Sequence, residues 1–169
     1  MQPRKEQFVK LSEIIPDGPN GGICPDLQAV SKEDVIKEMV HALVLAGKLD
    51  DAVSKKVIKA LMDREELGST GIGSGVAVPH AKHDAISDLV CAFGRSSKGI
   101  QFDALDGEPV YVVFLLLSSK GASGSHLEAL AFISRLVRDE KFVRFLRDAK
   151  DSKSIRDLLN QADQTFGGS

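Results

Sequence analysis

The residue of this chain best suited to chemistry is His80, which directly follows the short apolar segment 76–79. An imidazole nitrogen is a competent nucleophile near neutral pH, and if a neighbour holds one ring nitrogen, the other is free to attack phosphorus. The glycine-rich run 68–75 gives the backbone freedom just ahead of this segment, and Pro79 restricts the approach to the histidine. Most surface histidines in turns perform no chemistry, so this local pattern alone favours a His80 without a function.

The glycine-rich run also invites a nucleotide-binding interpretation, because backbone N–H groups in such loops can hold phosphate. A Walker A loop requires Gly-Lys-Ser/Thr at its end, and a dinucleotide-binding fingerprint requires a third glycine where Val76 stands. Both loops also follow a strand and open a helix, whereas this run follows a predicted helix and opens a predicted strand. The spacing therefore argues against a nucleotide site, and no cofactor is predicted.

A second alternative is a zinc site, because His80 and His83 have an H-x-x-H spacing. A structural zinc site needs about four protein ligands and a catalytic one about three. Only the scattered Cys91, His126 and Asp84 are available to complete the set. No metal site is therefore predicted.

Two helices are predicted ahead of the glycines. Ser31 is placed to cap the first, and Gly47 ends it. The second begins around Asp50 or Asp51 and ends before Gly68. Apolar residues recur with helical spacing in both segments, which indicates that each buries one face.

The middle of the chain has the pattern of strands. Segments 76–79, 89–93 and 110–117 are predicted as strands, with Asp106-Gly107 placed to close a hairpin between the last two. Helical spacing returns from His126 onward. Helices at both ends of a strand-rich middle indicate an α/β fold, a single domain in which a mixed β-sheet is flanked by helices on both faces.

Composition narrows the classes of partner. The 169 residues have a formal net charge of -2 with basic and acidic residues interspersed, so no basic field is expected to hold nucleic acid. The longest apolar stretch, 110–117, is far too short to cross a bilayer, and the first residues lack the apolar run of a signal peptide. Cys24 and Cys91 form no CxxC motif and suit a reducing compartment. We expect a cytoplasmic protein with no direct membrane insertion.

The string from Asp63 to Lys82, DREELGSTGIGSGVAVPHAK, resembles the active-site signature of the fructose/mannitol-type (type 2) enzyme IIA family of the phosphotransferase system, which includes the nitrogen-regulatory proteins. The resemblance continues in GIQFDALDGEPV at 99–110, in the apolar segment 111–117 and in SHLEAL at 125–130, and it covers roughly residues 30–159. It implies an enzyme IIA domain at 31–162. In the N-terminal segment 1–30, the dense turn-forming residues of 16–25 predict an extended surface loop. A flexible tail is expected at 163–169.

Carried over residue by residue, the resemblance implies that His80 accepts a phosphoryl group, that Arg64 is a cation near that group, and that His126 is a second histidine in the same pocket. It also implies a phosphotransferase component with a phosphohistidine intermediate. The donor would be the histidine-containing phosphocarrier protein, and the acceptor an enzyme IIB component in sugar uptake. A transferring phosphoryl group spreads negative charge over its oxygens, so a guanidinium and the amides of the glycine-rich run are suitable donors to it.

Two alternatives to a transport component stay open. The first is a regulatory binding module, in which phosphorylation of His80 controls the binding of a target protein. The string LGSTGIG at 67–73 is closer to the nitrogen-regulatory branch, which favours this alternative. The second is a degenerate domain without phosphorylation, against which the joint presence of Arg64, His80 and His126 argues.

Overall fold

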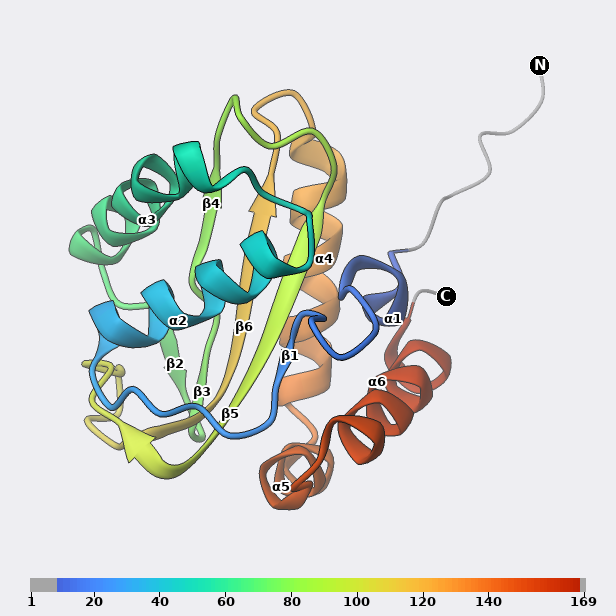
Figure 1. Cartoon of the computed structure of the whole chain (residues 1–169). Coiled ribbons are helices and arrows are strands. Elements are labelled where there is room, and N and C mark those ends of the chain that lie inside the picture. Colours follow the sequence, from blue (N-terminus) through green and yellow to red (C-terminus); the bar gives the residue numbers. More distant parts are fainter. Residues whose placement is uncertain (1–8, 168–169) are drawn as a thin grey trace.

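The structure is a computed structural model that describes residues 9–167, and over this range a mixed β-sheet lies between two groups of helices (Figure 1). This confirms the predicted α/β class, with helices on both faces of the sheet. The elements in chain order are α1 (Leu11–Ile14), β1 (Ile23–Cys24), α2 (Lys32–Leu45), α3 (Asp51–Glu66), β2 (Gly71–Gly73), β3 (Val76–Ala77), β4 (His80–Lys82), β5 (Val90–Ile100), β6 (Val110–Ser118), α4 (Ser123–Val137), α5 (Glu140–Asp148) and α6 (Ser152–Phe166).

The sheet is built around β5 and β6, which pair antiparallel. Their connection turns at Ala104–Gly107, where the Gly107 amide donates to the Ala104 carbonyl, so the hairpin expected at Asp106-Gly107 is confirmed. The strand order is β1-β5-β6-β3-β2, and β4 also pairs with β6, parallel to it like β3. Strand β5 runs on to Ile100, well past the predicted end at Phe93.

The first two long helices begin and end where their caps predict. Ser31 accepts a hydrogen bond from the Asp34 amide at the start of α2, and Asp50 accepts one from Ala52 at the start of α3. After α3 ends, Gly68 adopts a φ of 152°, a conformation that favours glycine. The end of α3 is therefore fixed just ahead of the glycine-rich run.

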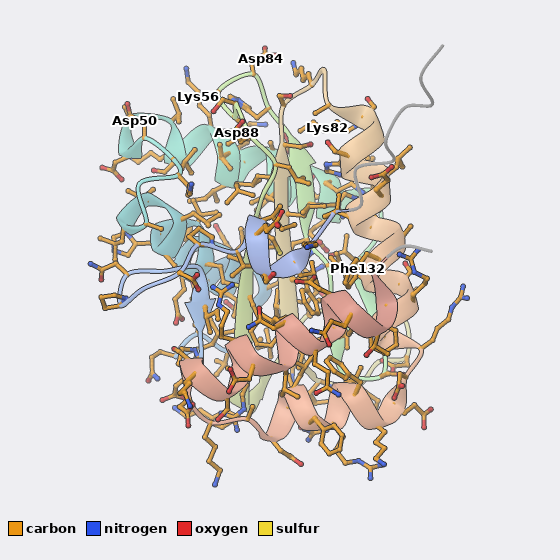
Figure 2. The ribbon with its side chains drawn as sticks, turned by 90° about the vertical axis from the view of Figure 1, so that its right-hand side faces the viewer. Asp50, Lys56, Lys82, Asp84, Asp88 and Phe132 are labelled. Atoms are coloured by element: carbon orange, nitrogen blue, oxygen red, sulfur yellow. The ribbon has the colours of Figure 1, made fainter. Side chains whose placement is uncertain are left out.

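Alternating side chains of β6 supply both halves of the core. Leu115 and Leu117 pack in the cluster beneath α2 and α3, whereas Phe114 and Leu116 pack in the cluster beneath α4, α5 and α6. Successive side chains of a strand point to opposite faces, so a continuous apolar strand is the pattern of one covered on both sides. Figure 2 shows Phe132 of α4 among the helices of the second face.

The segment before residue 31 contributes to the same sheet. Residues 16–25 were expected to form an extended surface loop, but β1 within them pairs parallel with β5, placing Ile23 opposite Phe93. Turn-forming residues exclude a long strand, but they still allow a two-residue strand at the edge of a sheet. The expectation of a loop alone overlooked this short strand.

Helix α6 forms hydrogen bonds and an ion pair with residues 11–17 near the beginning of the described chain. The carboxylate of Asp163 accepts the Leu11 amide at 2.7 Å. The Arg156 guanidinium forms an ion pair with Asp17 at 2.7 Å and donates to three carbonyls, those of Ser12, Ile15 and Pro16. Residues 163–166 of the tail that was expected to be flexible belong to α6, and Gly167 follows the helix. Residues 168 and 169 lie outside the described range.

Within residues 9–167, none of the helices combines the length and the apolar character needed to cross a membrane.

Candidate active site

The pairing of the chain with β6 breaks off before Pro79 and resumes at His80. The carbonyl of Pro79 accepts the Leu116 amide of β6 at 2.9 Å, while the Val78 amide turns away and donates to Thr70 at 3.0 Å. Proline has no N–H to offer a neighbour, so the ladder is interrupted here and resumes in β4. His80 is therefore the first residue of β4, opposite Leu116, and not a residue beyond a strand end as expected.

The ring of His80 has one nitrogen bound and one free. Its Nδ1 lies 2.7 Å from the Val78 carbonyl oxygen. A carbonyl can only accept, so in the neutral ring Nδ1 carries the proton and Nε2 carries the lone pair. The side chain is half-buried and lines an open cleft of about 610 Å³. In this arrangement Nδ1 holds the ring in place and Nε2 is free to act as a nucleophile.

His126 lies beside His80, with the ring centroids 5.6 Å apart and the planes at 60°. It belongs to the first turn of α4, which begins at Ser123, ahead of the point from which helical spacing was predicted. Its Nδ1 lies 2.6 Å from the hydroxyl of Ser118, the last residue of β6. Ser118 is two residues beyond Leu116 and so faces α4, a position that period-two counting along the apolar strand could have identified.

Cationic side chains complete the cleft. Arg64 reaches it from the last turn of α3, and its guanidinium donates to the Gly68 carbonyl at 2.9 Å. Lys82 of β4 lies beside the N-terminal end of α4, where its ammonium donates to the Ser123 hydroxyl at 3.1 Å (Figure 2). The structure thus brings Arg64, His80 and His126 from three separate elements to one cleft at the β4 edge of the sheet.

Both histidines are held in the neutral form near neutral pH. Burial lowers the pKa of His80, and the charges of Arg64 and Lys82 lower it further, against opposing contributions from the Val78 carbonyl and from Glu65. Burial, followed by the neighbouring His80 and Lys82, lowers the pKa of His126 to about 4. A neutral imidazole retains the lone pair that a nucleophile requires.

The glycine-rich run does not line the cleft, contrary to the expectation that its amides would meet a phosphoryl group. It forms β2, which pairs antiparallel with β3 and turns back at Ser74 and Gly75. Both residues line a different hollow, beside Asp106 and Tyr111 at the opposite end of β6. The backbone freedom of the glycines thus serves a hairpin that leads into β3.

The remaining histidines lie apart from this chemistry. His41 is exposed on α2, and Nδ1 of His83 accepts the Ala85 amide at 3.0 Å. Among residues 9–167 there is no group of three or more His, Cys, Asp or Glu side chains arranged to hold a metal ion.

Comparison with known proteins matches most of the chain to one family. The family model described as "Phosphoenolpyruvate-dependent sugar phosphotransferase system, EIIA 2" matches residues 20–162. A fructose-specific EIIABC component of this system from Bacillus subtilis (strain 168) is 41% identical over 139 residues, which are 82% of this chain and only 22% of that longer protein.

Two nitrogen regulatory proteins match over nearly their whole length. That of Bradyrhizobium diazoefficiens is 38% identical over 81% of this chain and 88% of its own. The crystal structure of nitrogen regulatory protein IIA-Ntr from Neisseria meningitidis superimposes with a TM-score of 0.77 at 31% identity, covering 88% of this chain and 97% of that one.

Proposed function

The chain belongs to the EIIA 2 family of the phosphoenolpyruvate-dependent sugar phosphotransferase system, and on that basis we propose that it carries a phosphoryl group on Nε2 of His80. Members of this family are phosphotransferase components. The observation that carries the proposal is the 2.7 Å contact between Nδ1 of His80 and the Val78 carbonyl, which leaves Nε2 with its lone pair in the cleft. The proposed donor is the histidine-containing phosphocarrier protein of the system.

In the proposed step, the Nε2 lone pair of His80 attacks phosphorus in line with the donor nitrogen. The new N–P bond forms as the donor's N–P bond breaks, and the donor imidazole leaves with that electron pair. The proton on Nδ1 of His80 stays in place, so the ring becomes imidazolium-like. The Val78 carbonyl then accepts a charge-assisted hydrogen bond, which is stronger than a neutral one.

The surroundings of His80 can stabilise the phosphoryl oxygens. Arg64 supplies a forked cation and Lys82 a second positive charge, and both side chains line the cleft beside His80. If the Ser118 hydroxyl donates to Nδ1 of His126, then Nε2 of His126 bears the proton and donates to a phosphoryl oxygen. His126 would then assist transfer without being modified itself.

Intact-mass measurement tests the proposal. The protein should gain the mass of one phosphoryl group from phosphoenolpyruvate only when enzyme I and the phosphocarrier protein are both present. The bond should be labile in acid and stable in alkali, as a phosphoramidate is. Labelling that persists in His80→Ala, or that needs ATP instead, would refute the assignment. In His126→Ala, labelling should be slower and should remain on His80 alone.

The onward step is proposed in two forms. In sugar uptake, the phosphoryl group would pass to an enzyme IIB component. Relatives that this chain matches over most of their length include nitrogen regulatory proteins and also a fructose-specific EIIA component. The string LGSTGIG at 67–73 favours the second form, in which phosphorylation of His80 controls the binding of a target protein. A pulldown with phosphorylated protein, unphosphorylated protein and His80→Ala distinguishes them. Capture that depends on phosphorylation supports regulation, and transfer of the label to an added IIB component supports uptake.

A further inference from the structure

The hollow at the end of β6 opposite His80 takes no part in the proposed reaction. Its volume is about 510 Å³, within the range of about 300 to 1,000 Å³ that is usual for small-molecule sites. Its walls are the turn between β2 and β3, the chain that enters β6, and one face of α5. The charged and aromatic side chains that line it are Asp106, Glu108, Tyr111, Glu140, Arg144 and Arg147.

The guanidinium of Arg147 is held in a fixed orientation at this hollow. It lies over the Tyr111 ring, with Cζ 3.6 Å from the ring centroid. Gly99 packs against the same ring so closely that a Cβ there would lie 3.3 Å from it. The carbonyl of Arg147 also accepts Nε–H of Arg95 at 2.5 Å, which joins the end of α5 to β5. A guanidinium stacked in this way is already ordered, and its planar fork of N–H groups matches a carboxylate.

Arg144 supplies a second cation on the same face of α5. It precedes Arg147 by three residues, and side chains with this spacing are neighbours on a helix surface. Among residues 9–167, neither guanidinium forms an ion pair with a carboxylate. This wall of the hollow is therefore suited to the carboxylate of a ligand.

The carboxylates around the hollow set a second requirement. Asp106 is already engaged, because its two oxygens accept the amides of Ser74 and Glu108 at 3.2 and 3.0 Å. The side chains of Glu108 and Glu140 form no ion pair with any residue of the described range. A ligand with only negative charge would meet these carboxylates as like charges, whereas an ammonium group would be attracted to them.

We propose that this hollow binds a free α-amino acid, with its carboxylate on the guanidiniums of Arg144 and Arg147 and its ammonium group on the carboxylates of Glu108 and Glu140. A zwitterion of this kind carries the two opposite charges that the lining offers to pair. The hollow shares no lining residue with the His80 cleft, so the inference does not depend on the proposed function.

Amide chemical shifts of the full chain, labelled with ¹⁵N, measure the binding. Each common L-amino acid is added singly at about 10 mM, a concentration that nearly saturates a site with a Kd of about 1 mM. At least one should bind, with its largest shifts within 74–75, 106–111 and 140–147. The amino acid that binds most tightly is then compared with its deaminated acid and with its decarboxylated amine. Each of these should bind more weakly by roughly tenfold or more, because each loses charge-assisted hydrogen bonds.

Variants assign the two charges to their walls. Arg147→Gln should weaken binding of the amino acid by roughly tenfold to a hundredfold. Glu108→Gln should weaken binding of the amino acid but not of its deaminated acid. Arg138→Gln is the matched control, because Arg138 is an exposed arginine that does not line the hollow, and its affinity should be unchanged.

His80→Ala should bind the amino acid as tightly as the unmodified protein, which separates this site from the proposed phosphoryl transfer. The proposal would be overturned if no amino acid shifted the amides of the hollow, if the deaminated acid bound as tightly as the amino acid, or if Arg147→Gln kept the full affinity.

Discussion

The buried His126 should make the stability of the protein depend on pH in a window set by its own titration. Its pKa is about 4 in the folded protein, against an ordinary value of 6.5, because the ring is buried and lies near His80 and Lys82. Between these values the unfolded chain binds one more proton than the folded protein. Stability from this group is therefore complete above pH 6.5 and is lost as the pH falls toward 4.

The size of this loss follows from the two pKa values. One pKa unit corresponds to about 1.4 kcal/mol, so the gap is equivalent to about 3 kcal/mol of unfolding free energy. His80, whose pKa is also lowered, contributes in the same direction but is present in both the variant and the unmodified protein. Replacing His126 by Gln removes the titrating ring and keeps a polar side chain near Ser118.

Urea unfolding at a series of pH values from about 4 to 7.5 measures the effect. Unfolding free energies of His126→Gln and of the unmodified protein should differ by a constant above pH 6.5. Below that, the unmodified protein should lose about 3 kcal/mol more than the variant by pH 4. The exposed His41 of α2 supplies a matched control, because its replacement by Gln removes a histidine without opening the buried site. Parallel curves for His126→Gln and the unmodified protein over the whole range would refute the reasoning.

Substitutions at three further residues separate the roles of individual side chains. Arg64→Ala should slow phosphoryl transfer by roughly tenfold to a hundredfold, the equivalent of a charge-assisted hydrogen bond. Arg64→Lys should slow transfer less, because the charge stays although the planar fork is lost. Rapid-quench rates equal to the unmodified rate in both variants would show that Arg64 is only a solvated surface residue. Ser118→Ala should slow phosphoryl transfer by about threefold to tenfold, because His126 loses the hydroxyl that contacts its Nδ1. His80 should remain the labelled site. An unchanged transfer rate would mean that His126 does not need this partner. Arg156→Ala should lower the unfolding free energy by about 1–3 kcal/mol, because it removes the donor to three carbonyls. Chemical denaturation measures this loss of stability. Mass-based labelling should show an unchanged rate of phosphoryl transfer, and a slower rate would contradict this expectation.

The parts of the fold that were predictable are those with strong local signals. Helices α2 and α3 have caps and breakers at their ends, and β6 is a long apolar run. Strands β1 and β4 were missed because each has only two or three residues and lies beside Pro25 or Pro79. Such strands exist through their pairing with β5 and β6, which is information that local sequence does not contain.

The site residues likewise fall into those that the sequence predicts and those that it does not. Arg64 and His80 stand in one recognisable string and His126 in a second, and the structure brings the three to one cleft. Ser118 depends on a contact with His126, across the β6–α4 connection, that only the folded chain creates. The glycine-rich run was misassigned to the cleft because its composition fits both an anion-binding loop and a hairpin, and only the pairing of β2 with β3 decides between them.

The short strands around β5 and β6 also bear on self-association. Among the described residues, the strands that flank this antiparallel pair, β1, β3 and β4, and the outermost strand β2 beyond β3 are only two or three residues long. Strand β6 contains an uncharged apolar run of the kind that forms intermolecular sheets when exposed. Outer strands this short offer little template for pairing with another chain. Aggregation of this protein is therefore expected to require global unfolding, so its rate should follow the unfolding rate and not the concentration of native protein alone.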